Sequence, residues 1–327
     1  MLDRQLDAMM KQAQAAGLPD LCDLPPGPCR GLYREILAAA DMPPADVAVD
    51  NRRIAAPGGS ATIGLRVYTP RGDAAAEGRA LIVYYHGGGY VLGDLDGYDR
   101  VARQLCADSD AVVVSVDYRL APEHPHPAAV DDAWVALQWV ADHARELGAD
   151  PTRLGVAGDS AGAVLATVMT LMAREHAGPH IGFQALLYPA AAGGHDGDYP
   201  SRTAHAAGPT LTLRTMDYFN RHTFGTTGRA ADYRGAPLLA ANLADLPPSL
   251  LLLATHDPLR DEALAYGEAL LAAGNAVTLV EYHGLAHGFI SMAGGIGAAR
   301  LAQQQFAQAL RTGLAAHRDV SLTPPKD

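Results

Sequence analysis

Cysteine is scarce in this chain of 327 residues, which contains only three, at positions 22, 29 and 106. So small and odd a number excludes a disulfide framework and favours a reducing compartment. Cys22 and Cys29 lie six residues apart without a further Cys or His pair at the spacing of a zinc site. We therefore expect neither a disulfide involving Cys22, Cys29 or Cys106 nor a bound metal.

An excess of basic residues and long apolar runs are also missing. The 25 basic and 36 acidic residues give a net charge of −11, and no basic cluster stands out, which argues against nucleic acid or an anionic membrane surface as a partner. No stretch approaches the ~20 apolar residues that a membrane span needs, and residues 1–14 lack the apolar core of a signal peptide. These features predict a cytoplasmic protein without a membrane span, and they leave a homodimer open.

Short apolar runs alternate with helical patterns along most of the chain. That rhythm predicts an α/β fold with a mostly parallel central sheet flanked by helices. The expected strands are 46–56, 61–69, 80–85, 111–116, 154–157, 183–187, 249–254 and 277–282. The expected helices are 31–40, 101–107, 128–147, 161–173, 213–222, 262–273 and 298–315.

Two segments fall outside this alternation. Residues 1–45 contain a helical pattern with apolar residues on one face, and then Pro25-Pro26-Gly27-Pro28, which we expect to exclude helix. Residues 191–225 interrupt the strand rhythm with Gly, His, Asp and Thr, as lids do. We predict an N-terminal helical cap segment at 1–45 and an α/β domain at 46–320, with a cap insertion at 191–225. Residues 321–327 read as a frayed tail.

One five-residue motif organises the chain. Gly158-Asp159-Ser160-Ala161-Gly162 lies between an expected strand and an expected helix and fits the pattern G-x-S-x-G. Ser160 would sit on a strained turn that lifts its hydroxyl off the sheet, and the flanking glycines leave room for neighbouring backbone. The motif predicts that Ser160 is a nucleophile.

A serine hydroxyl needs a base, and the loops after the last two strands offer one. Asp257 follows the strand at 249–254, and His287 follows the strand at 277–282. The carboxyl ends of parallel strands share one edge of the sheet, so the two side chains and Ser160 should meet there. Their order along the chain, Ser, Asp and His, is that of the α/β-hydrolases. The imidazole would take the serine proton, and the carboxylate would orient the imidazole.

Neighbouring residues compete for both roles. Asp261 and Glu262 lie close to Asp257, but they begin a helix, where acidic side chains favour the helix dipole. His283 directly follows the expected strand, whereas Gly288 lets the loop at His287 turn back towards the serine. We therefore prefer Asp257 and His287. The remaining histidines, among them His124, His126, His195 and His205, are expected to be exposed or structural.

A third loop supplies glycines. His86-Gly87-Gly88-Gly89 follows the strand at 80–85, and consecutive glycines let backbone N–H groups approach the oxyanion that forms during ester hydrolysis. In this class of fold one N–H donor comes from such a loop and one from the residue after the nucleophile, here Ala161. No Lys followed by Ser or Thr stands at the spacing of a phosphate-binding loop.

Together these motifs resemble the hormone-sensitive-lipase-like esterases (bacterial family IV) of the α/β-hydrolase superfamily. The motifs that carry the resemblance are His86-Gly87-Gly88-Gly89-Tyr90, Asp117-Tyr118-Arg119-Leu120-Ala121-Pro122-Glu123, Gly158-Asp159-Ser160-Ala161-Gly162, Asp257-Pro258-Leu259-Arg260-Asp261-Glu262 and His287-Gly288-Phe289. They span residues 80–290 in order.

The resemblance implies a serine carboxylesterase that hydrolyses short-acyl esters through an acyl-enzyme, with a small-molecule ester as its partner and without a cofactor. It implies a triad of Ser160, Asp257 and His287 and oxyanion donors at Gly88, Gly89 and Ala161. Other residues would brace the oxyanion loop without reacting. They are His86, Tyr118, Arg119, Glu123 and Asp159.

Some features depart from the family or leave alternatives open. His126 replaces a usual aromatic residue, and Gly193-Gly194-His195 loosens the chain near the expected cap, which obscures the acyl preference. An amidase or deacetylase, a lactonase and a thioesterase would use the same residues. A non-catalytic small-molecule receptor of this family would lack the histidine, which is present here as His287.

Overall fold

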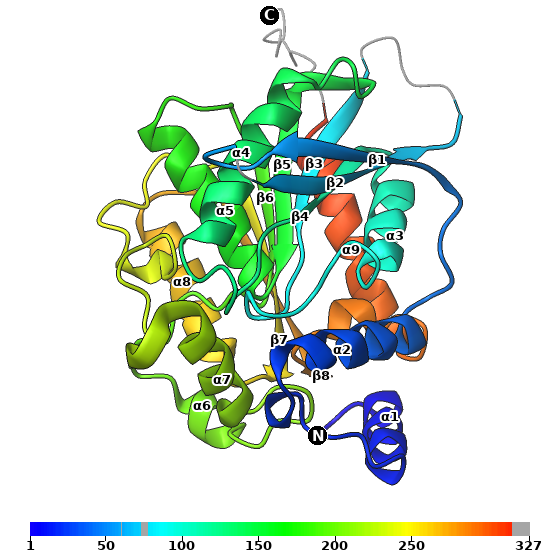
Figure 1. Ribbon diagram of the computed structural model, residues 1–327, viewed down its shortest axis with the longest axis vertical. Helices are drawn as coiled ribbons and strands as arrows, with labels where there is room; N and C mark the ends of the chain where they lie inside the picture. The colour runs from blue at the N-terminus through cyan, green and yellow to red at the C-terminus, as the bar shows by residue number, and fades with distance from the viewer. Residues whose placement is uncertain (60, 73–77, 316–327) are drawn as a thin grey trace, which may run out of the picture.

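An eight-stranded sheet forms the centre of the computed structural model, which describes residues 1–59, 61–72 and 78–315. Within these residues the strand order is β1-β2-β4-β3-β5-β6-β7-β8 (Figure 1). β1 and β2 pair antiparallel, as do β2 and β4, and all other neighbours are parallel. The strands are β1 (Val47–Ala55), β2 (Thr62–Pro70), β3 (Arg79–Tyr85), β4 (Val112–Asp117), β5 (Ala149–Asp159), β6 (Phe183–Leu187), β7 (Ser249–His256) and β8 (Val277–Ala286).

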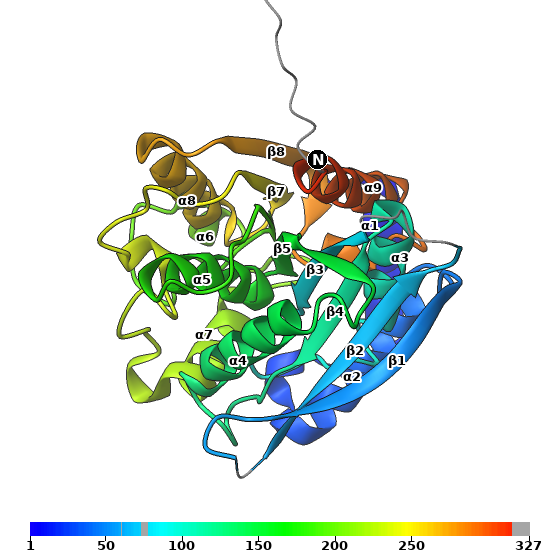
Figure 2. The ribbon, with the colours of Figure 1, turned by 90° about the horizontal axis from the view of Figure 1, so that it is seen from above.

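Helices cover both faces of the sheet. Figure 2 shows α4, α5 and α8 on one face and α3 and α9 on the other. The helices are α1 (Arg4–Ala15), α2 (Pro26–Ala40), α3 (Asp99–Ser109), α4 (Ala128–Asp142), α5 (Ala161–Glu175), α6 (Pro200–Ala204), α7 (Leu213–Phe224), α8 (Arg260–Ala272) and α9 (Gly297–Gly313). Short 3-10 turns are η1 (Leu21–Asp23), η2 (Gly225–Thr227), η3 (Pro237–Leu239) and η4 (Phe289–Ser291). Because the central strands are buried on both faces, they read as continuous apolar runs.

The strand register brings the expected site loops to one edge of the sheet. Tyr85, the last residue of β3, lies opposite Gly158 of β5, and His256 of β7 lies opposite Ala286 of β8. The loops that carry the glycine run, Ser160, Asp257 and His287 therefore start from the same edge. The mostly parallel α/β architecture predicted from the sequence is confirmed.

The N-terminal segment packs on this framework. Leu6 of α1 is fully buried in the core cluster on the α3 and α9 face, and Leu2, Met9 and Met10 pack against that cluster. Helices α1, α2, α6 and α7 all lie at the end of the molecule where β7 and β8 finish (Figure 1). None of the helices in the described part of the chain has the length and hydropathy required to cross a membrane.

Some expected boundaries were wrong. Helix α2 begins at Pro26, inside the run that we expected to exclude helix. Proline is tolerated there because the first N–H groups of a helix have no partner within it. Strand β8 continues to Ala286 through Gly284, whose N–H bonds to Thr255 Oγ1 beside a break in the register, so a glycine that looked like a turn lies within the strand.

Two further differences concern element ends, and a third is an additional element. Helix α4 ends at Asp142, β5 begins at Ala149 before an Asp-Pro pair that resembles a turn, and the short helix α6 was not expected. The expected tail at 321–327 lies outside the described residues.

Asp41, which ends α2, carries a testable consequence of this packing. The carboxyl is buried and its Oδ1 accepts hydrogen bonds from Met42 N (2.7 Å) and Gln303 Nε2 (3.3 Å). Burial raises the pKa of the Asp41 carboxyl from 3.8 to about 6, against those two hydrogen bonds. The ionised form therefore destabilises the folded state. This penalty is absent below pH ~4, grows as the pH rises and is complete above pH ~6.

We predict that Asp41→Asn raises the free energy of unfolding by up to about 3 kcal/mol at pH 7.5 and by almost nothing at pH 4. Urea unfolding of variant and wild type across this range measures the difference. Asp198→Asn, the same change at an exposed carboxyl, should produce no such trend. A constant difference between Asp41→Asn and wild type at all pH values would contradict the prediction.

Candidate active site

Ser160 occupies the sharp turn between β5 and α5. Its backbone has φ 53° and ψ −119°, and residues other than glycine rarely adopt such a positive φ. The Ser160 N–H donates to Leu187 O at 2.8 Å. A Cβ at Gly158 would lie 2.3 Å from Gly162 O, and a Cβ at Gly162 would lie 2.0 Å from Tyr85 O. Only glycine fits at either position, so the motif has a steric cause here.

Two residues from neighbouring strands complete a hydrogen-bonded chain with Ser160. His287 Nε2 lies 2.9 Å from Ser160 Oγ, and His287 Nδ1 lies 2.7 Å from Asp257 Oδ2. Asp257 is fully buried, and its second oxygen accepts the Leu259 N–H at 2.8 Å. The ring of Tyr188 packs against His287 with 4.6 Å between centroids. Both ring nitrogens of His287 are thus partnered and the ring is held from one side.

The competing residues point elsewhere. His283 lies exposed within β8, and His287 is the residue that directly follows the strand. Asp261 accepts the Ser201 N–H at 2.7 Å and pairs with Arg260. Neither His283 nor Asp261 is hydrogen-bonded to Ser160 among the described residues.

Glu262 has a role that sequence reasoning missed. We expected it to serve the helix dipole, but it is 1% exposed and binds Arg202 of α6 (Nη2 to Oε2, 2.6 Å) and the Ala192 N–H (3.1 Å). Burial raises the pKa of the Glu262 carboxyl, and the Arg202 guanidinium opposes that shift. The pair ties the 191–225 segment to α8 close to Asp257. No local pattern in the sequence marks Arg202 as its partner.

The glycine run has its carbonyl groups bonded and some of its N–H groups free. Gly88 (φ 113°) and Gly89 (φ 61°) both adopt positive φ. A Cβ at Gly88 would lie 2.3 Å from Leu92 O, and a Cβ at Gly89 would lie 2.3 Å from the Phe219 ring. Among the described residues, the N–H groups of Gly88, Gly89 and Ala161 have no hydrogen-bond partner. These are the three groups that the resemblance assigns as oxyanion donors.

Asp159 braces this loop from the nucleophile side. Its Oδ1 accepts Gly87 N at 2.7 Å and Tyr84 Oη at 2.8 Å, and its Oδ2 accepts Tyr98 Oη at 3.1 Å. Burial raises the pKa of the Asp159 carboxyl to about 6, although these hydrogen bonds oppose the shift. The Asp159 carboxylate thereby holds Gly87, the residue directly before Gly88 and Gly89.

His86 and Tyr118 brace the loop from behind. The His86 ring is fully buried and stacks on Tyr118 at 4.3 Å between centroids. Burial lowers the pKa of His86 to about 4, so the ring is neutral at pH 7. Its Nδ1 lies 2.8 Å from Gly87 O, while Tyr118 Oη donates to His86 O at 2.6 Å. A proton on Nδ1 would donate to Gly87 O, whereas the Tyr118 hydroxyl supplies its own proton to His86 O.

The other two expected braces act less directly. Arg119 forms a bidentate ion pair with the buried Asp132 of α4 and so fixes the start of the following loop. Glu123 is half-exposed and does not touch the glycine run, because its carboxylate binds Arg30 of α2.

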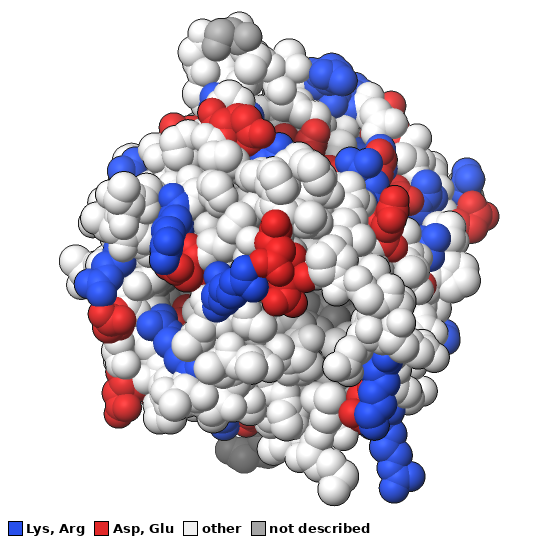
Figure 3. Space-filling view, turned by 60° about the horizontal axis from the view of Figure 1, so that its bottom comes forward, with Lys and Arg blue, Asp and Glu red and all other residues white. Residues whose placement is uncertain are grey.

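A cavity of about 930 Å³ opens onto Ser160 and His287. Figure 3 turns this end of the molecule forward and shows a hollow bordered largely by uncharged side chains. Besides the glycine loop, the nucleophile turn and the start of α8, its walls come mainly from α1 with the following turn, α2, the 190–224 stretch, and the loop after His287. Representative lining residues are Met9, Met10, Leu37, Met216, Phe219 and Met292.

The histidines expected to be exposed or structural do not join the hydrogen-bonded chain and do not line the cavity. His124 is exposed, and the Nε2 of His195 lies 2.7 Å from Ala230 O. His126, which replaces an aromatic residue, packs edge-on against Phe224 with 5.4 Å between centroids. His205 packs against the ring of His256 at 5.3 Å.

Comparison with known proteins agrees with this geometry. A family profile described as an alpha/beta hydrolase fold matches residues 82–291. The chain is 43% identical over 270 residues to "Esterase LipI" of Mycobacterium tuberculosis, which covers 82% of each chain. It is 37% identical over 236 residues to "Ethyl acetate hydrolase" of Pseudomonas putida, which covers 71% of this chain and 72% of that one.

Solved structures of esterases share the whole fold. An esterase of the hyperthermophile Pyrobaculum calidifontis superposes with a TM-score of 0.87 at 38% identity, covering 95% of this chain and 98% of the other. A thermostable esterase of Pseudomonas putida gives a TM-score of 0.89 at 33% identity, with 96% and 98% covered. The chain therefore belongs to the hormone-sensitive-lipase-like family of the α/β-hydrolase superfamily, and it is a carboxylic ester hydrolase.

Proposed function

We propose that the enzyme hydrolyses short-acyl carboxylic esters through an acyl-enzyme on Ser160, with His287 as base, Asp257 as its orienting carboxylate, and Gly88, Gly89 and Ala161 as oxyanion donors. The observation that carries the proposal is the continuous chain from Asp257 Oδ2 through His287 to Ser160 Oγ, at 2.7 and 2.9 Å.

In the first half of the reaction, Ser160 Oγ attacks the ester carbonyl while His287 Nε2 takes the serine proton. The carbonyl oxygen becomes an oxyanion and accepts hydrogen bonds from the free N–H groups beside it. Each such donor is worth roughly 3–4 kcal/mol of transition-state stabilisation. The tetrahedral intermediate then expels the alcohol, which receives the proton from His287, and the acyl group stays on Ser160.

In the second half, water enters where the alcohol left. His287 takes a proton from the water as its oxygen attacks the acyl carbonyl, and the same N–H groups bind the second oxyanion. Collapse releases the carboxylic acid and returns the proton to Ser160. Asp257 stays ionised throughout and holds the imidazole in the tautomer with its proton on Nδ1.

The comparisons support esters over the other substrates that this machinery accepts. Relatives at 37–43% identity bear the names esterase, carboxylesterase and ethyl acetate hydrolase. The last is named for a short-acyl ester, which supports the short-acyl preference proposed here. No feature of the cavity favours an amide or a lactone, and the presence of His287 argues against a receptor.

Residues 1–45 and 191–225 together would form the cap over this site, on a catalytic domain at 46–320. Their support is that both segments supply walls of the cavity: Met9 and Met10 come from the first, and Met216 and Phe219 come from the second. The sulfur-containing side chains are adaptable and suit a surface that meets varied acyl groups.

The assignment of the nucleophile predicts single-site labelling. A fluorophosphonate should add one mass to the peptide that contains Ser160, as measured by mass spectrometry. Ser160→Ala should fold and remain unlabelled, while Ser109→Ala, at a buried serine of α3 outside the cavity, should label like the wild type. Labelling at another residue would refute the assignment.

The assignment of acid and base predicts a graded loss of turnover. Asp257→Asn should lower kcat by roughly 10⁴, because the amide favours the wrong tautomer of His287. His287→Ala should lower kcat at least as far. His283→Ala, at the exposed position on β8, should keep wild-type turnover. An inactive His283→Ala beside an active His287→Ala would show that we chose the wrong base.

The cap assignment predicts that filling the cavity changes substrate length preference. Ala13→Trp, at a position of α1 that lines the cavity, should reduce kcat/KM most for the longest members of ester series graded in acyl length and in alcohol length. Lys11→Trp places the same side chain on the exposed face of α1 and should leave both profiles unchanged. A uniform decrease across both series would mean that α1 only stabilises the fold.

A further inference from the structure

The N–H groups proposed to bind the oxyanion are held through the carbonyl groups of the same peptides. A peptide unit is planar, so fixing its C=O on one side fixes its N–H on the other. Gly87 O is bonded to His86, which orients the Gly88 N–H. Gly88 O accepts Val91 N (3.0 Å) and Leu92 N (2.8 Å), which orients the Gly89 N–H. The second donor therefore depends on where residues 91 and 92 lie.

Arg30 of α2 holds this part of the loop. Its Nε donates to Val91 O at 2.8 Å, and its Nη2 donates to Ala121 O at 2.9 Å. Ala121 N in turn donates to Tyr90 O at 2.8 Å. One planar guanidinium thus bridges the loop after β3 to the loop after β4, and Glu123 pairs with its outer edge at 3.0 and 2.6 Å. A lysine offers no rigid fork and cannot make these contacts together.

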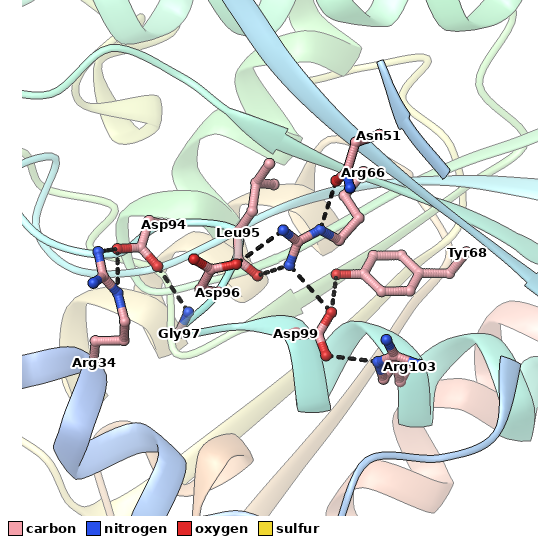
Figure 4. Close-up of polar contacts among 10 residues, drawn as sticks. All are labelled: Arg34, Asn51, Arg66, Tyr68, Asp94, Leu95, Asp96, Gly97, Asp99 and Arg103. Atoms are coloured by element: carbon pink, nitrogen blue, oxygen red, sulfur yellow. Dashed lines mark hydrogen bonds and ion pairs between the residues drawn. The ribbon is translucent and has the colours of Figure 1, made fainter. Parts of the chain in front are cut away.

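Neighbouring residues of α2 bring Arg30 to this position. Cys29 is fully buried in one apolar cluster with Val91 and Leu92. Arg34, one helical turn later, donates through Nε to Asp94 Oδ2 at 2.9 Å. Figure 4 shows Arg34 reaching Asp94, whose other oxygen accepts the Gly97 N–H at 2.7 Å. The same face of α2 therefore docks on residues 91–97, directly after the glycine run.

The far side of that segment is held independently of the cap. Arg66 of β2 binds Asp96 at 2.8 Å, Asp99 at 3.2 Å and Leu95 O at 3.1 Å (Figure 4). Residues 95–99 are thus anchored to the sheet. Within the stretch from 90 to 94, α2 supplies the side-chain hydrogen bonds, from Arg30 to Val91 O and from Arg34 to Asp94, while Thr223 of α7 donates to Gly89 O.

The ion pair alone does not explain this arrangement. Glu123 is 53% exposed, and pairs so exposed contribute at most about 1 kcal/mol to stability. Val91 and Ala121, by contrast, are buried, so their carbonyls depend on Arg30 as a hydrogen-bond donor. Arg30 does not line the cavity and has no direct contact with bound substrate to make.

We propose that Arg30 is a positioning residue for the oxyanion hole: it acts through Val91 O and Ala121 O to orient the Gly89 N–H group. Helix α2 of the N-terminal segment then contributes to the chemical step as well as to the walls of the cavity. This inference rests on the proposed function, since it requires the Gly89 N–H group to bind the oxyanion.

The test compares Arg30→Met with Arg153→Met. Arg153 also donates to two backbone carbonyls, Leu314 O at 2.7 Å and Gly78 O at 3.2 Å, but it lies away from the site. Arg30→Met should lower kcat by about 10- to 100-fold, the loss expected for a displaced or missing oxyanion donor, and should change KM less than about twofold. Arg153→Met should leave kcat unchanged.

The affinity for an oxyanion analogue distinguishes a positioning role of Arg30 from a purely structural one. A trifluoromethyl ketone is attacked by Ser160 Oγ, whose proton passes to His287, and the resulting hemiketal oxygen carries the negative charge. Arg30→Met should weaken this inhibitor by the same factor as kcat/KM, while KM for the ester stays nearly constant. Added guanidinium ion should partly restore the activity of Arg30→Ala, whereas Arg30→Lys should remain impaired.

Wild-type kcat and inhibitor affinity in a folded Arg30→Met would overturn the proposal, as would an equal loss of kcat in Arg153→Met. If Arg30→Met does not fold, the same measurements on Arg30→Lys test the proposal. That variant keeps the positive charge and the aliphatic stem but lacks the planar guanidinium group. Failure of the proposed function has a different signature: the wild type itself would not label at Ser160. Labelled and active wild type with no effect at Arg30 would refute only this inference.

Discussion

The site depends on a contact too close for any side chain. β3 and β5 are parallel neighbours, and the turn after β5 folds back until Gly162 lies against the end of β3, where a Cβ would be 2.0 Å from Tyr85 O. This approach brings Ser160 and the loop after β3 within reach of one carbonyl carbon. The strain at Ser160, with its positive φ, follows from the same turn and is offset by the hydrogen bond from its N–H to Leu187 O.

Around this contact Asp159 and His86 are bonded to the glycine loop, although His86 Nε2 and Tyr90 Oη have no hydrogen-bond partner among the described residues. Burial shifts the pKa values of both Asp159 and His86. Asp159 is fully enclosed, with its pKa raised to about 6, yet it accepts three hydrogen bonds and holds Gly87. His86 remains neutral and bonds to Gly87 O. A preorganised site of low polarity makes each N–H donor more effective than the same group in water. The braces therefore contribute by limiting reorganisation when the oxyanion forms.

The parts of this site that lie in continuous motifs could be predicted from the sequence. Ser160, Asp257, His287 and the glycine run each follow a strand, so the sheet alone brings them together. The partners from distant segments could not be predicted, because Arg30 meets Val91 across 61 residues and nothing local marks the pair. The prediction at Pro26 was wrong for a related reason. A proline is tolerated in the first turn of a helix but not in its interior, and the local sequence does not show that α2 starts at this residue.

Both predicted cap segments contact the oxyanion loop as well as the cavity. Arg30 from the first binds Val91 O, while Thr223 from the second donates to Gly89 O at 3.2 Å and Phe219 packs over Gly89. A substrate group in the cavity would therefore contact the helices that hold the two glycines. Binding energy from such a remote group raises kcat only where it is realised in the transition state. In this arrangement α2 and α7 contribute both to the walls of the cavity and to the position of the glycine loop, although through different side chains.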